Sequence, residues 1–149
     1  MRALLQRVTH AAVSVDGHIV GETGPGLLVL VGVGHADTES VADGLARKVA
    51  ELRIFADEAG RTNRSLLETS GGALVVSQFT LYADTRRGRR PGFTDAADPD
   101  RAEALYERFA GALRDVGVER VETGAFGAEM AVELVNDGPF TVWLDTEVR

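Results

Sequence analysis

Residues 136–141 read Asn-Asp-Gly-Pro-Phe-Thr, and two apolar, strand-like runs flank them. The runs are Met130–Val135 and Phe140–Leu144, so Asn-Asp-Gly alone predicts a hairpin turn between two strands. Pro139 changes this interpretation, because proline has no N–H to donate to the returning strand. Proline also narrows the trans preference of the Gly138–Pro139 bond to about 0.5–1 kcal/mol. The stretch is therefore either a surface turn with a trans proline or a rigid cis Gly-Pro tip that displays bare carbonyls.

Strand-like sequence also fills the first 34 residues. Ala3–Val15 is rich in β-branched and apolar residues, Asp16-Gly17 predicts a turn, and Leu27–Val31 is a continuous apolar run. The apolar period then lengthens, and Asp37 is a candidate cap for a helix. The apolar face of that helix is formed by Val41, Leu45, Val49 and Leu52.

The second half of the chain again contains strand-like sequence followed by a helical pattern. Ala73–Tyr82 predicts another strand, which ends in a polar loop, residues 83–97. Asp98-Pro99 starts a second helix, which Gly117 ends. Its apolar stripe is Ala102, Leu105, Phe109, Leu113 and Val116. From residue 118 the chain returns to strands. The element order, ββαββαβββ in outline, predicts a single α/β domain, residues 1–149, of mixed β-sheets with two main helices packed on one side.

Composition limits the possible functions. The 149 residues contain no cysteine, which excludes disulfides, thiolate zinc sites and cysteine nucleophiles. The three histidines lack metal-ligand spacing, so we expect no metal and no cofactor. Charged residues interrupt the apolar start of the chain, so we expect no signal segment, no membrane contact and a cytoplasmic protein. The formal net charge of −7 means that a nucleic-acid partner would need a local basic patch.

Ser77-Gln78-Phe79-Thr80 ends the second strand block and is the first candidate for chemistry. The ends of strands are where sheets commonly present catalytic groups. A strand period of two would place Ser77 and Phe79 on one face and Gln78 and Thr80 on the other. A nucleophilic Ser77 or Thr80 would need a neighbouring base, and the histidines, all in the first quarter of the chain, offer none. The alternative is that both hydroxyls only satisfy backbone groups at the edge of a strand.

A basic loop supplies the local patch. Four arginines, Arg86, Arg87, Arg89 and Arg90, lie within five positions, and Phe93 follows them. Guanidinium groups match the geometry of phosphate, and an aromatic ring can stack on a base. The alternative is a solvated loop. Arg7, between two strand residues, either reaches solvent or braces backbone carbonyls of another segment.

These residues together resemble the D-aminoacyl-tRNA deacylase (D-tyrosyl-tRNA deacylase) family. The similarity runs essentially from end to end, and two motifs define the family, Ser-Gln-x-Thr and Asn-x-Gly-Pro-x-Thr. Ser77–Thr80 and Asn136–Thr141 match them without departure. Such coverage is specific, and it favours the cis form of the Gly138–Pro139 bond.

The resemblance implies a homodimer in which Gly138 and Pro139 of one subunit reach the pocket beside Ser77, Gln78, Phe79 and Thr80 of the other. It implies that Arg7 holds the Gly-Pro backbone, and that Phe126 and Met130 lie near the pocket for the terminal adenosine of tRNA. The expected reaction is hydrolysis of the ester between a D-amino acid, or glycine, and tRNA. Amide donors near Phe79 and Thr80, together with the ribose 2′-OH, would assist it, and L-aminoacyl esters would be rejected.

Two other functions are compatible with the sequence. One is a hydrolase of small D-amino acid esters or amides that uses Thr80 as nucleophile, which predicts turnover without tRNA. The other is a non-catalytic RNA-binding module built on the basic loop, which predicts tRNA affinity without ester cleavage. The sequence does not rank the D-amino acids or the tRNAs.

Overall fold

The computed structural model describes residues 1–148. In chain order the elements are β1 (Arg2–Val15), β2 (His18–Thr23), β3 (Gly26–Gly32), α1 (Glu39–Glu51), β4 (Phe55–Ala56), β5 (Thr62–Arg64), α2 (Leu66–Thr69), β6 (Gly72–Ser77), the 3₁₀ turn η1 (Phe79–Tyr82), α3 (Pro99–Asp115), β7 (Val121–Thr123) and β8 (Ala131–Asp145).

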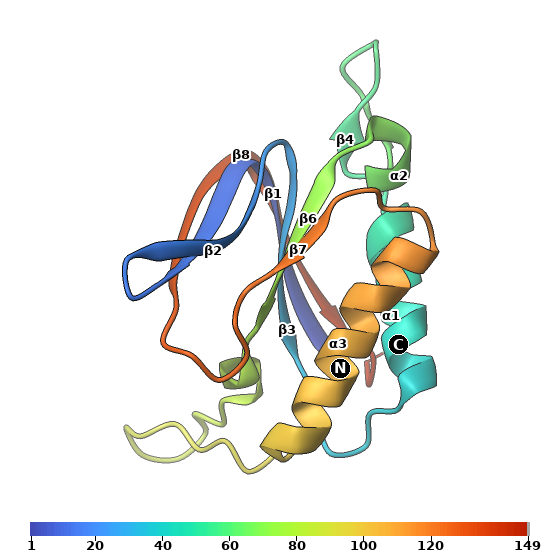
Figure 1. Ribbon diagram of the computed structural model, residues 1–149. Helices are drawn as coiled ribbons and strands as arrows, with labels where there is room; N and C mark the ends of the chain where they lie inside the picture. The colour runs from blue at the N-terminus through green and yellow to red at the C-terminus, as the bar shows by residue number, and fades with distance from the viewer. Residues whose placement is uncertain (149) are drawn as a thin grey trace.

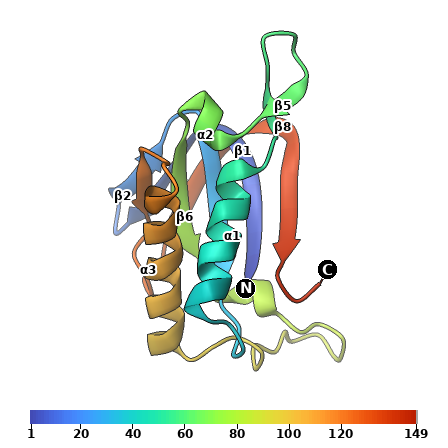
Figure 2. The same cartoon turned by 90° about the vertical axis from the view of Figure 1, so that its right-hand side faces the viewer.

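A six-stranded mixed sheet organises the chain (Figure 1). The strands run in the order β2-β1-β3-β6-β7, and β8 also pairs with β1. One edge of β1 pairs with β3 along residues 2–8 and with β2 along residues 11–15, while β8 runs along the other edge. The pairs β3–β6 and β6–β7 are parallel and the others antiparallel. β4 and β5 form a separate two-stranded hairpin that stands out from the sheet (Figure 2).

The helices α1 and α3 pack side by side on one face of the sheet (Figure 2). The larger core lies between them and the sheet, and its fully buried members include Phe109, Leu113 and Leu5. A smaller core on the opposite face gathers Val8, Val13 and neighbours from β3 and β6. The predicted fold class, mixed β-sheets with two main helices on one side, is confirmed. Among the described residues, no helix is long and apolar enough to cross a membrane.

The predicted hairpin at residues 136–141 is wrong, because the chain does not turn back there. β8 continues as one strand antiparallel to β1, with Asn136 opposite Val8 and Thr141 opposite Gln6. β8 advances by five residues between these two pairs, whereas β1 advances by two. β8 therefore carries three residues that have no partner on β1 at this point. We name the residues that bulge out opposite Arg7, 137–140, the tip loop; its Gly138–Pro139 bond is cis. Pairing of both flanks with the same strand outweighs the local turn signal.

Two boundaries also differ from the predictions. The strand predicted to run to Tyr82 ends at Ser77, and the next residues form η1. The continuous apolar run misled because Tyr82 is buried by this turn and not by a strand. The cap of α1 is Thr38, whose hydroxyl accepts from the Val41 N–H at 3.3 Å, and not Asp37. The Asp37 carboxylate instead accepts from the Met1 ammonium and the Gly34 N–H in the interior, where an acidic side chain requires such partners.

Candidate active site

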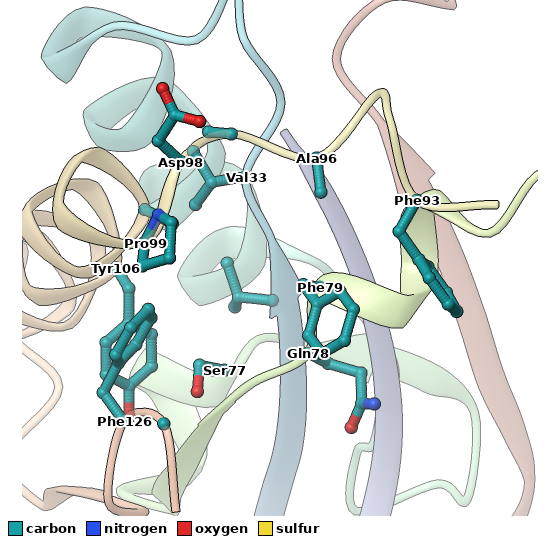
Figure 3. A pocket seen from close by; sticks show the side chains of 14 residues that line it. Val33, Ser77, Gln78, Phe79, Phe93, Ala96, Asp98, Pro99, Tyr106 and Phe126 are labelled. Atoms are coloured by element: carbon teal, nitrogen blue, oxygen red, sulfur yellow. The ribbon is translucent and has the colours of Figure 1, made fainter.

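A cavity of about 410 Å³ opens where β3, β6, η1 and the start of α3 meet (Figure 3). Its walls are mainly apolar and aromatic, as is usual for small-molecule sites. The lining residues are Val31, Val33, Ser77, Gln78, Phe79, Phe93, Ala96, Ala97, Asp98, Pro99, Ala102, Tyr106, Phe126 and Gly127. Two segments predicted from the sequence, Ser77–Phe79 and the end of the basic loop, are thereby brought together with Phe126.

The end of β6 explains how Ser77, Gln78 and Phe79 reach this cavity. The Gln78 N–H donates to the Val31 carbonyl at 2.7 Å, which ends the sheet pairing, and the chain then turns into η1. Phe79 is 56% exposed at the mouth of the cavity. Thr80 does not line it, and its hydroxyl accepts a hydrogen bond from the Gln78 carboxamide. The predicted alternation of faces therefore fails, because residues 79–82 are not a strand.

Aromatic rings dominate two sides of the cavity. The rings of Phe79 and Phe93 meet edge to face with centroids 5.0 Å apart, and those of Tyr106 and Phe126 lie 5.9 Å apart. The Tyr106 hydroxyl donates to the Val75 carbonyl at 2.9 Å, and burial raises the pKa of this phenol. Tyr106 is therefore a neutral, fixed part of the wall whose hydroxyl is engaged by the Val75 carbonyl.

The basic loop reaches the cavity through Phe93, and its arginines are exposed. Arg86 forms a bidentate salt bridge with Asp84, in which Nε and Nη2 each lie 2.8 Å from a carboxylate oxygen. These hydrogen bonds hold the pKa of Asp84 well below its usual range. In the described chain, Arg87, Arg89 and Arg90 have no such acidic partner. The basic patch predicted from four arginines therefore has three free guanidinium groups.

The tip loop lies on another part of the sheet and is held from behind by Arg7. Arg7 Nε donates to the Asp137 carbonyl at 3.1 Å, and Nη2 lies 3.5 Å from the Gly138 carbonyl. Nη1 donates to the Ile54 carbonyl at 2.6 Å, and the guanidinium lies 4.5 Å from the centroid of the Phe140 ring. Residues 137–139 are exposed. Of the two interpretations of Arg7, the one in which it braces backbone carbonyls is confirmed.

The tip loop cannot reach the cavity of its own chain. Arg7, behind the loop, lies four residues along β1 from Ala3, which pairs with Val31 and through it with Ser77. From β8 to β6 there are three strand spacings, so the separation is on the order of 20 Å. Figure 1 shows β4, which follows Ile54, at the opposite end of the molecule from the loop of residues 83–97. The two predicted site segments are thus far apart within one chain.

Other residues differ from the sequence predictions. Met130 does not line the cavity and packs against the smaller core. Asp98 and Tyr106 line it although the sequence reasoning did not single them out as site residues. A hydroxyl on the buried stripe of α3 was the available signal for Tyr106, since a buried phenol requires a partner. None of the three histidines lines the cavity.

The family model and the curated relatives indicate the same family. The model of the D-Tyr-tRNA(Tyr) deacylase family matches residues 4–145. D-aminoacyl-tRNA deacylase of Ruegeria pomeroyi is 63% identical over 145 residues, 97% of this chain and 99% of that protein. D-aminoacyl-tRNA deacylase of Thermomicrobium roseum is 62% identical over 146 residues, 98% of this chain and 94% of that protein.

Solved structures show the same fold. A c-Myc DNA unwinding element binding protein superimposes with a TM-score of 0.93 at 38% identity, over 98% of this chain and 99% of that one. A probable eukaryotic D-amino acid tRNA deacylase superimposes with a TM-score of 0.83 at 21% identity, over 96% and 97%. Because the family model and relatives above 60% identity span nearly the whole sequence, this chain belongs to the D-Tyr-tRNA(Tyr) deacylase family.

Proposed function

We propose that this protein is a D-aminoacyl-tRNA deacylase, a cytoplasmic hydrolase of the ester between a D-amino acid and the terminal ribose of tRNA. The observation that carries the proposal is one chain with both an aromatic cavity beside a basic loop and a separate exposed loop, residues 137–139, whose backbone is held by Arg7. Family membership supports the reaction class. Residues 1–149 would act as one catalytic domain.

The aromatic cavity suits the terminal adenosine of tRNA. Its volume and flat aromatic walls match a nucleoside, and Phe126 offers a ring for stacking. The exposed Arg87, Arg89 and Arg90 would bind phosphates of the acceptor stem, with Phe93 joining their loop to the cavity. Met130, which packs against the smaller core, is not part of this proposed tRNA site.

The proposed active unit is a homodimer in which the tip loop of one subunit enters the cavity of the other. The separation on the order of 20 Å within one chain requires a second copy if the loop is to meet Ser77. In the described chain β8 pairs with β1 alone, so its outer edge has no strand, and Trp143 on it is 47% exposed. A long free edge with an exposed aromatic ring favours association with another chain.

The reaction does not require a strong side-chain base or nucleophile, because an aminoacyl ester is already reactive. Water attacks the ester carbonyl carbon, and the ribose 3′-oxygen leaves with a proton that the neighbouring 2′-OH helps to deliver. η1 leaves its first amide groups, those of Phe79 and Thr80, without acceptors inside the turn, which makes them available to the developing oxyanion. Ser77 and Gln78 would position the ester. Thr80 has no base beside it in the described chain, which disfavours it as a nucleophile.

Selectivity would come from the tip loop. The Gly138 and Pro139 carbonyls would accept hydrogen bonds from the substrate ammonium, while Arg7 holds the loop in place. A rigid backbone near the substrate Cα leaves no room for a side chain in the L direction. Rejection is then steric and requires no recognition of the D side chain. D-amino acids of different sizes, and glycine, should all be accepted.

The test is deacylation of glycyl-, D-alanyl- and L-alanyl-tRNA measured in parallel. We expect cleavage of the glycyl and D-alanyl esters, and sparing of the L-alanyl ester by more than the ~10–200-fold that one methylene provides in a hydrophobic pocket. Comparable cleavage of the D- and L-alanyl esters, or an inert glycyl ester, would contradict the proposed filter. Binding of tRNA without any ester cleavage would leave only the RNA-binding alternative.

A further inference from the structure

Asn136 forms the neck of the tip loop. Its side-chain Nδ2 donates to the Arg7 carbonyl at 2.8 Å and to the Phe140 carbonyl at 3.1 Å. These two carbonyls flank the place where β8 leaves the ladder, and a bulge of this size removes backbone partners there. The carboxamide therefore joins the two ends of the loop to each other and to β1.

The loop is thus held at two levels. Arg7 holds the outer part of the loop through the Asp137 and Gly138 carbonyls. Asn136 holds the neck, where the loop leaves and rejoins the ladder with β1. The Arg7 contacts fix where residues 137 and 138 lie above β1 and also hold the Phe140 ring, but none of them reaches the Phe140 carbonyl. The hydrogen bond from Asn136 fixes that carbonyl, and with it the direction of the peptide groups that precede it.

We infer that Asn136 is a positioning residue of the chiral filter, which sets the direction of the Gly138 and Pro139 carbonyls by closing the neck of the tip loop. This inference rests on the proposed function. Asn136 itself touches no substrate, because its carboxamide is used on the chain's own carbonyls. Its contribution is to the ratio of D to L cleavage and not to the bond-breaking step.

The side-chain chemistry at this position is restrictive. Two acceptors must be served by one short side chain, and a carboxamide carries two N–H donors. Aspartate has nearly the same shape but offers no donor when ionised, and it would set a negative charge against two carbonyl oxygens. Glutamine retains both donors on a side chain longer by one methylene. Alanine removes the link altogether.

The experiment measures kcat/KM for D-alanyl- and L-alanyl-tRNA in the wild type and in Asn136→Ala, Asn136→Asp and Asn136→Gln. We expect the D-over-L ratio to fall at least about tenfold in the alanine and aspartate variants, since small misplacements of a positioning group have effects of this size or larger. The glutamine variant should recover part of the ratio. The thermal midpoint, the dimer and the affinity for uncharged tRNA should change little, because the loop is exposed.

Asn63→Ala is the matched control, because Asn63 lies in the exposed hairpin of β4 and β5 and is the other asparagine of the chain. Its D-over-L ratio should equal that of the wild type. An unchanged D-over-L ratio in Asn136→Ala and Asn136→Asp overturns the inference. An equal loss of activity on the D- and L-alanyl esters together with a lowered thermal midpoint also overturns it, and so does an Asn136→Ala variant that does not fold. If the wild type itself does not discriminate, the proposed function fails first, and the two failures are distinguishable.

Discussion

The cavity and the tip loop differ in what their functional atoms are. For binding, the cavity presents mainly side chains: aromatic rings form its walls, and Tyr106 is held by the Val75 carbonyl. The tip loop presents backbone: its residues 137–139 are exposed, and two side chains outside it, Arg7 and Asn136, hold its carbonyls. Backbone carbonyls, which every residue type has, are thus placed here by two particular side chains, those of Arg7 and Asn136.

This difference separates two tasks. Side-chain walls can recognise one group, such as a nucleobase, because their shape and stacking surface are specific. Backbone carbonyls offer the same atoms whatever the substrate side chain. They can therefore discriminate the configuration at the substrate Cα without recognising the side chain. Changes in the cavity should therefore alter affinity for all esters equally, whereas changes in the tip loop should alter the ratio between D and L esters.

Removing the tip loop should have the largest effect. Deletion of residues 137–139 takes out the three excess residues, so that Phe140 would stand opposite Arg7 while Asn136 and Thr141 keep their partners on β1. We expect a folded protein whose D-over-L ratio in kcat/KM falls by more than about 100-fold, because the deletion removes the proposed steric filter.

The measurement is the pair of rates on D-alanyl- and L-alanyl-tRNA, with circular dichroism to establish the fold. Affinity for uncharged tRNA serves as the control for the cavity and should stay close to that of the wild type. A deletion variant that still spares the L ester would mean that selectivity resides in the cavity walls, and the contrast between the two regions would fail.

Phe126→Ala should have a smaller effect, on substrate affinity and not on the D-over-L ratio. Loss of one stacking ring costs about 1–3 kcal/mol per base, so we expect KM for both D-alanyl- and glycyl-tRNA to rise on the order of tenfold or more. The D-over-L ratio should not change. Phe55→Ala, at the start of β4 and outside the cavity, is the matched control and should leave KM unchanged. A changed D-over-L ratio in Phe126→Ala would show that the two tasks are not separate.

The smallest effect is expected at Asp84. Because Asp84 has a lowered pKa in the folded protein, its pair with Arg86 is complete above the ordinary carboxyl pKa of about 3.9 and is lost only as the pH falls through the lowered value. Between pH 5 and 9 (about one unit above that ordinary value and upward) its titration should not affect tRNA binding.

Asp84→Asn releases Arg86, so tRNA affinity should rise a few-fold and the salt slope should steepen by about one phosphate contact. Fluorescence anisotropy at several salt concentrations measures both. Asp43→Asn is matched, because Asp43 makes a similar pair with Arg108 on the helical face, with both contacts at 2.6 Å. An unchanged slope in Asp84→Asn would make the basic loop a solvated face.

The parts of the fold that could be predicted are those with a strong local signal. The end of α3 at Gly117 follows from its φ of 111°, which favours glycine, and the turn at Asp16-Gly17 follows in the same way. The helix α2 was not predicted, although its capping box was readable: Ser65 accepts from the Glu68 N–H, and Glu68 accepts from the Ser65 N–H.

The parts that could not be predicted depend on distant pairing. Nothing near Pro139 says that both flanks of the tip loop pair with β1, some 130 residues earlier in the chain. The candidate residues were predicted, but the separation of Arg7 and its loop from Ser77 appears only once the strand order is known. Asp37 was misread for the same reason, because its partner Met1 is remote in sequence.

The pairing of the first strand with the last also orders events during synthesis. Every residue that lines the cavity, from Val31 to Gly127, leaves the ribosome before β8 does, whereas one edge of β1 has no strand until β8 emerges. Such long-range pairing makes folding slow and leaves an unpaired edge exposed meanwhile. The nascent chain thus acquires the parts of its pocket before the strand that carries its tip loop, and β1 needs protection from wrong partners until translation is nearly complete.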